Sequence, residues 1–167
     1  LPLGQVLALG RAQADLSDPG GLHALLEREQ PDCIVNAAAY TAVDKAESEP
    51  ELAQRVNAAA PGLLADWAAA HDAWLVHYST DYVFDGSKPA PYTEDDAPNP
   101  QSVYGQSKLA GEQAIAASGC RHLILRTSWV YAARGSNFAK TMLRLAAERD
   151  SLRVIADPVS YTHLRAH

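Results

Sequence analysis

The sequence has few cysteines, no long apolar run and no concentration of positive charge, and each absence argues against a class of protein. Cys33 and Cys120 are the two cysteines, and without metal-ligand spacing they are expected to be free thiols in a reducing cytoplasm. No apolar run approaches the roughly 20 residues of a membrane span, and nothing resembles a secretory signal. The net charge of −6, with scattered Lys and Arg, argues against nucleic-acid binding.

The glycine-rich turn of a dinucleotide-binding fold is also absent. Such a fold begins with a strand, a glycine-rich turn and a helix whose N-terminus holds the pyrophosphate. Residues 5–9 predict a strand near the start, but no Gly-x-x-Gly-x-x-Gly follows a first strand. We therefore expect the first βα unit to lie upstream of Leu1. Arg11 would then follow the second strand, where an Arg tolerates a 2′-phosphate and slightly favours NADPH, although a solvated Arg fits equally well.

What is present is a regular alternation of apolar strands and amphipathic helices. Hydrophobic periodicity predicts helices over residues 19–29, 50–70, 102–118 and 137–149, and strands over residues 32–36, 73–77, 121–127 and 152–155. This order predicts an α/β fold with a doubly wound parallel sheet, Rossmann-like and incomplete. The Trp-Leu-Val run in the strand over residues 73–77 predicts burial on both faces.

A tyrosine and a lysine stand four residues apart at the start of the helix over residues 102–118. On a helix, Tyr104 and Lys108 lie on one face. An ammonium one turn away should lower the phenol pKa and make Tyr104 a usable general acid or base. The spacing alone is weak, because most such pairs are surface residues. Upstream, however, an apolar strand runs into the hydroxyls and carboxylate of Ser79, Thr80 and Asp81.

The stretches STDYVFDG, VYGQSKLAGE and LRTSWVY resemble the dTDP-4-dehydrorhamnose reductase family of extended short-chain dehydrogenases/reductases. The resemblance implies a cytoplasmic oxidoreductase in which NADPH or NADH reduces the 4-keto group of dTDP-4-dehydro-L-rhamnose. A dTDP-sugar is the implied partner, without nucleic acid or membrane, and a homodimer is an implied assembly of the full-length parent. Two alternatives stay open: another extended sugar-nucleotide epimerase or dehydratase, and a non-catalytic regulatory subunit on the same fold.

The resemblance also implies roles for individual residues. Tyr104 would donate a proton to the sugar carbonyl, Lys108 would lower the tyrosine pKa and hold the nicotinamide ribose, and Thr80 would orient the carbonyl. The implied cofactor contacts are Asp15, Leu16, Ala38, Ala39, Tyr40, Thr41 and Tyr78, together with Tyr104 and Lys108. The implied substrate contacts are Thr80, Asp81 and Trp129. Asn57 matches a family Asn near the central strands, and no metal ligand is expected.

The resemblance runs from about residue 4 to residue 157. We expect residues 1–157 to be part of an NAD(P)-binding domain and residues 158–167 to be an unrelated appended tail. His163 and His167 lie in that tail, four residues apart, with no further metal ligands nearby. The family's second, substrate-binding lobe has no counterpart, so the isolated chain is expected to be inactive.

Overall fold

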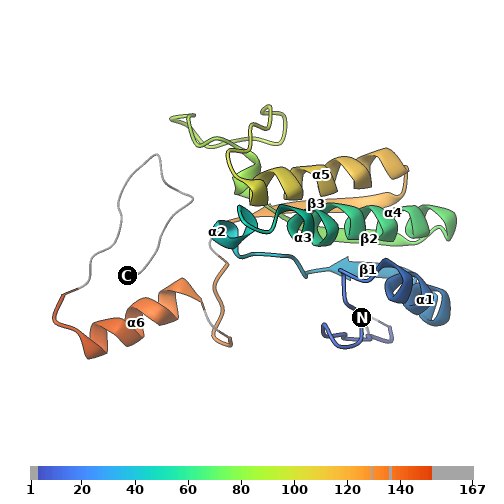
Figure 1. Ribbon diagram of the computed structural model, residues 1–167, viewed down its shortest axis with the longest axis horizontal. Coiled ribbons are helices and arrows are strands. Elements are labelled where there is room, and N and C mark those ends of the chain that lie inside the picture. Colours follow the sequence, from blue (N-terminus) through green and yellow to red (C-terminus); the bar gives the residue numbers. More distant parts are fainter. Residues whose placement is uncertain (1–3, 129, 136, 152–167) are drawn as a thin grey trace.

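The computed structural model describes residues 4–128, 130–135 and 137–151 and contains a three-stranded parallel sheet (Figure 1). The strands lie in the order β1 (Cys33–Asn36), β2 (Trp74–Thr80) and β3 (Arg121–Thr127). The central strand β2 pairs with β3 from Trp74 opposite Arg121 to Thr80 opposite Thr127. All three carboxyl ends therefore meet at one edge. The predicted α/β class with a parallel sheet is confirmed.

Helices occupy the connections between the strands. They are α1 (Pro19–Glu29), α2 (Val43–Ala46), α3 (Pro50–Gln54), α4 (Ala60–Ala70), α5 (Val103–Ser118) and α6 (Phe138–Glu148), with a π-helical turn η1 (Arg55–Ala59) and a 3-10 turn η2 (Asp81–Val83). Side-chain caps begin the long helices, since Asp18 accepts from the Gly21 N–H and Ser102 from the Gly105 N–H. Gly119 ends α5 in the left-handed conformation. The helix predicted over residues 50–70 is confirmed, with η1 as an insertion within it.

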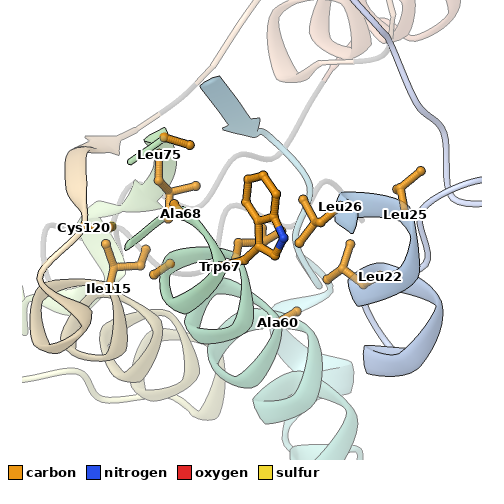
Figure 2. Close-up of a cluster of buried hydrophobic side chains, with 12 residues drawn as sticks. Leu22, Leu25, Leu26, Ala60, Trp67, Ala68, Leu75, Ile115 and Cys120 are labelled. Atoms are coloured by element: carbon orange, nitrogen blue, oxygen red, sulfur yellow. The ribbon is translucent and has the colours of Figure 1, made fainter. Parts of the chain in front are cut away.

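The core lies between one face of the sheet and helices α1, α4 and α5. Leu75 of β2 is fully buried in this cluster, and Figure 2 shows Trp67 of α4 close to Leu26 of α1. The Trp67 indole N–H donates to Glu27 Oε1 at 2.7 Å, which satisfies the polar atom of a buried ring. Burial of each large apolar side chain here stabilises the fold by roughly 1.5–3 kcal/mol.

The other face of the sheet is open among the described residues. Side chains alternate along β2, so that Leu75 and His77 are buried whereas Trp74 and Tyr78 are 46% and 41% exposed. The expectation that this strand is buried on both faces is therefore wrong, because no described helix packs on the second face.

The start of the described chain also differs from prediction. Residues 5–9 are exposed and form no strand. A strand requires a ladder partner for its backbone groups, and the described part of the chain offers residues 5–9 none. The carbonyl of Gly10 instead accepts from the Gln13 and Ala14 N–H groups in a turn. The predicted strand over residues 152–155 and the tail over residues 158–167 lie outside the described residues.

Candidate functional site

The candidate site lies where β2 ends and α5 begins. Thr80 is the last residue of β2, and its Oγ1 accepts from the Tyr82 N–H at 3.2 Å, which caps η2. Tyr104 lies in the first turn of α5. A Cβ on Gly105 would collide with the Tyr82 carbonyl, so only glycine allows this close approach of α5 to η2. Open α/β sheets bind ligands at this edge.

The structure brings Tyr104 and Thr80 together. Tyr104 is 8% exposed, and burial raises its pKa above the ordinary value, while a hydrogen bond with the Thr80 side chain acts in the opposite direction and the Asp81 charge adds to the rise. The net direction is therefore opposite to the lowering expected from the spacing to Lys108, because burial is the largest influence on the Tyr104 pKa. A raised pKa keeps the phenol protonated at neutral pH, which suits a proton donor.

Lys108 is almost fully buried, one turn of α5 further on. Its Nζ donates to the Tyr78 carbonyl at 2.7 Å and lies 3.2 Å from His77 Nε2. Burial lowers the pKa of Lys108 to about 8, and the negative charge of Glu112 limits that fall. A buried lysine with a depressed pKa in such a place is a functional-site candidate.

Glu112 continues the same stripe of α5 by four more residues. Its carboxylate accepts from the Ser79 hydroxyl and forms an ion pair with Arg126 of β3, with Nη2 and Oε2 2.6 Å apart. The hydrogen bond that Arg126 donates to Glu112 raises the pKa of Arg126. Glu112 was assigned no role from the sequence, although its spacing from Tyr104 and Lys108 predicted the same face. The stripe therefore ties α5 to β2 and β3 through polar contacts.

Asp81 connects the ends of two strands. Its Oδ1 accepts from Thr80 Oγ1 at 3.2 Å, and its Oδ2 accepts from the Ser128 hydroxyl at 2.6 Å. Ser128, which follows β3 directly, was not singled out from the sequence. Trp129, a predicted substrate contact next to Ser128, lies outside the described residues.

Asn57 holds the segment after β1 against α5. From its buried position in η1, its Oδ1 accepts from the Tyr40 N–H at 2.8 Å, and its Nδ2 donates to the Tyr40 carbonyl and to Ser107 Oγ, both at 3.0 Å. The Tyr40 hydroxyl donates to Glu49 at 2.7 Å. This segment contains Ala38, Ala39 and Thr41, three further residues predicted to contact the cofactor.

The remaining predicted cofactor contacts stand apart from this group. Asp15 accepts from the N–H and hydroxyl of Ser17 before α1, and it pairs with the exposed Arg11 at 3.3 Å. Leu16 packs against the core cluster. The Tyr78 side chain lies on the open face of the sheet, although its carbonyl binds Lys108. Among the residues that the structure describes, no three His, Cys, Asp or Glu side chains gather as a metal site.

Comparison with known proteins identifies the family. Residues 2–161 match the family model described as the RmlD substrate binding domain. The chain belongs to the RmlD family. It is 54% identical over 160 residues to the dTDP-4-dehydrorhamnose reductase of Salmonella typhimurium, with 93% of this chain and 54% of that protein covered. Identity to the reductase of Escherichia coli strain K12 is 53%, with the same coverage. The RmlD-family chain thus spans about half the length of these relatives.

Solved structures of related proteins agree with the fold. The dTDP-4-dehydrorhamnose reductase ortholog of Clostridium acetobutylicum matches with a TM-score of 0.87 and 40% identity, covering 92% of this chain and 54% of that one. The Bacillus anthracis reductase in complex with NADP matches with a TM-score of 0.80 and 40% identity, covering 84% of this chain and 50% of that one. The Rossmann-like architecture and the resemblance inferred from the sequence are confirmed.

Proposed function

We propose that this chain is the catalytic half of an NAD(P)H-dependent dTDP-4-dehydrorhamnose reductase, which reduces the 4-keto group of dTDP-4-dehydro-L-rhamnose to give dTDP-L-rhamnose. The observation that carries the proposal is the buried Thr80 and Tyr104 pair, with Lys108 one turn behind, at the carboxyl edge of the sheet. A cytoplasmic location and a homodimer of the full-length protein are part of the proposal and rest on the family. No described helix is long and apolar enough to cross a membrane.

The residues present suit the nicotinamide end of NADPH or NADH. The Tyr104 hydroxyl and the Lys108 amine are groups that hydrogen-bond ribose hydroxyls. Ala38 after β1 is exposed, so that a flat ring can approach its backbone. When bound, the nicotinamide supplies the hydride. The complex of the Bacillus anthracis relative with NADP supports this assignment. Asp15 and Leu16 are proposed to lie near the adenine, and Tyr40, Thr41, Ala39 and Tyr78 to line the cofactor.

The chain itself supplies the proton and the orientation of the substrate. Tyr104 keeps its proton at neutral pH and donates it from the phenol oxygen to the sugar carbonyl oxygen. The Thr80 hydroxyl turns its single proton from Asp81 Oδ1 to the same carbonyl oxygen and fixes its direction. Asp81 and Trp129 are proposed to contact the sugar. In this proposal, residues 1–157 are part of an NAD(P)-binding domain and residues 158–167 are an appended tail.

A chimeric enzyme tests the proposed function. Residues 4–157 replace the matched half of the Salmonella typhimurium reductase, and NADPH oxidation is followed with dTDP-4-dehydro-L-rhamnose. We expect turnover by the chimera, and Tyr104→Phe should lower kcat by roughly 10²–10⁴ because it removes the transferable proton and keeps the ring.

The control is Tyr92→Phe, which removes a phenol that binds Asp85 in the loop after β2. This variant should retain the kcat of the chimera. Equal kcat for the chimera and Tyr104→Phe would overturn the assignment of the proton donor. Cofactor binding without turnover would favour the regulatory-subunit alternative.

A further inference from the structure

A buried polar chain runs from the end of β1 through β2 to α5, and the proposed reaction leaves most of it unused. Asn36 of β1, His77 of β2 and Lys108 of α5 are 5%, 0% and 1% exposed. Asn36 Nδ2 lies 3.1 Å from His77 Nδ1, and His77 Nε2 lies 3.2 Å from Lys108 Nζ. The chain continues from Asn36 Oδ1 to the N–H of Ala38 at 3.2 Å. It therefore joins the buried lysine to the segment after β1.

The directions of these hydrogen bonds are coupled. The Ala38 N–H is a donor, so Asn36 turns its carbonyl oxygen toward Ala38 and its NH₂ group toward His77. His77 Nδ1 must then accept. A neutral imidazole has one donor and one acceptor nitrogen, so Nε2 carries the hydrogen and donates toward Lys108. Lys108 Nζ accepts this hydrogen bond as an amine while it donates to the Tyr78 carbonyl.

An ammonium at Lys108 reverses the chain. An ammonium has three donors and no acceptor, so His77 Nε2 must accept and Nδ1 must carry the hydrogen. That hydrogen faces the Asn36 NH₂ group unless the amide rotates. Rotation directs the NH₂ group at the Ala38 N–H, which loses its acceptor. Proton uptake by Lys108 therefore leaves the imidazole with its single N–H proton but moves that proton to the other nitrogen.

We propose that His77 is a positioning residue that couples the protonation of Lys108 to the segment after β1, through the amide of Asn36. The proposal deepens the proposed function and rests on it, because Lys108 and Ala38 are the groups assigned to the cofactor. In the amine state, Ala38 is held by Asn36. In the ammonium state, that hydrogen bond is broken. Protonation of Lys108 therefore changes the hydrogen bonding of the segment after β1.

The surrounding charges allow this coupling in a useful pH range. Burial and the Lys108 charge lower the pKa of His77 to about 3, so that the imidazole stays neutral and changes only its tautomer. Burial lowers the pKa of Lys108 to about 8. Tyr104 and Glu112 lie on the same stripe of α5, Arg126 of β3 pairs with Glu112, and Asp81 of η2 acts on Tyr104. These titratable and charged groups lie on α5, β3 and η2.

Nuclear magnetic resonance of the labelled 167-residue chain tests the coupling without any cofactor or sugar. Long-range ¹H–¹⁵N spectra report the His77 tautomer, the ¹³Cε shift reports the protonation of Lys108, and the backbone amide shift reports the hydrogen bond of Ala38. The titration runs from about pH 6.5 to about pH 9.5, around the Lys108 midpoint. We expect His77 to change from the Nδ1–H to the Nε2–H tautomer as pH rises. The Ala38 amide should follow with the same midpoint as Lys108. A constant tautomer, or an Ala38 shift with a different midpoint, overturns the proposal.

Asn36→Leu distinguishes the coupling from the general effect of burial on the Lys108 pKa. It removes the amide that links His77 to Ala38 and adds no charge. We expect the Lys108 midpoint to rise by about 0.7 pH units, a roughly five-fold gain in proton affinity equivalent to one hydrogen bond. Ala38 should then stop following Lys108. The control is Val35→Leu, the neighbouring position on the open face, which should leave all three titrations unchanged. An unchanged midpoint in Asn36→Leu contradicts the proposal.

The wild-type titration decides the matter even if Asn36→Leu does not fold. The two proposals can also fail independently. Co-titration in a chimera that has no reductase activity would reject only the proposed function, whereas an active chimera with a fixed His77 tautomer would reject only the coupling.

Discussion

At the scale of single residues, burial decides the electrostatics of the site. Tyr104, Lys108 and His77 all have pKa values moved toward their neutral forms, and burial is the first cause for each. Low dielectric surroundings penalise the charged form of any group, whatever its sign. Burial therefore makes a charge on any of these three groups more costly in the folded interior than in water.

His77 makes stability depend on pH. Its pKa falls from 6.5 in the unfolded chain to about 3 in the folded chain, so the unfolded state binds more protons between these values. Stability is then fully present above pH 6.5 and is lost as pH falls toward 3, by up to about 1.4 kcal/mol per pH unit. Removing the imidazole with His77→Gln should flatten this slope.

Urea unfolding of the wild type and His77→Gln at intervals between about pH 5 and pH 6.5 measures the slope below the ordinary histidine pKa. His77→Leu is the companion variant, since it abolishes titration but cannot form the hydrogen bonds of glutamine. Both variants should show the flatter dependence of the free energy of unfolding on pH. Only the leucine variant should also lose the hydrogen bonds of the side chain at position 77. A wild-type slope in both variants would assign the effect to other groups.

At the scale of elements, the position of α5 depends on two glycines that face other backbone segments. Gly105 meets the Tyr82 carbonyl of η2, and Gly111 meets the Asn57 carbonyl of η1. A Cβ at either place would collide with backbone, which cannot move as a flexible side chain can. The π-helical turn η1 directs Asn57 toward Tyr40 and Ser107 at the same contact. The two glycines and the π-helical turn together fix the position of the helix that contains Tyr104 and Lys108.

Gly111→Ala should destabilise the chain by about 1–3 kcal/mol, because the added methyl group must displace α5 from η1. The control is Gly20→Ala in α1, where the new Cβ has only ordinary contact distances. That variant should be neutral or more stable by up to about 1 kcal/mol, since alanine favours helix over glycine. Thermal unfolding of both variants measures the difference. Equal stability would show that α5 has room at η1.

At the scale of the whole molecule, the sheet has one covered face and one open face. Val35, Val76 and Leu123 stand opposite one another in register across β1, β2 and β3 on the open face. Val35 is 60% exposed and Leu123 is 49% exposed, and Trp74 lies beside them on the same face. Contiguous apolar surface of this kind is a site of association.

Leu123→Glu should reduce the binding of the dye ANS and the light scattering of the concentrated chain, because a charge then interrupts the apolar row. Leu143→Glu on α6 is the matched control, since Leu143 is 73% exposed and α6 lies away from the sheet (Figure 1). It should change both signals little. Equal reduction by the two variants would mean that net charge, rather than the open face, controls association.

The sequence alone determined the class of fold, most helix and strand positions and the family, because apolar periodicity and cap residues such as Asp18 and Ser102 act over short distances. It also brought Tyr104 and Lys108 to one face of α5 through helical spacing. Only the tertiary structure decided that residues 5–9 form no strand and that one face of β2 is open, because both depend on which partners are present in space.

Tertiary structure also decided the chemistry of the site. The sign of the Tyr104 pKa shift was predicted wrongly from spacing, since burial by the surrounding elements is the largest influence on this pKa and cannot be read from one helix. Asn36, His77 and Arg126 come from three different strands. His77 and Arg126 contact α5 only when the sheet and helix pack, and Asn36 joins this network through His77. Spacing along one element reveals which side chains share a face, whereas contacts between elements and their burial arise from packing alone.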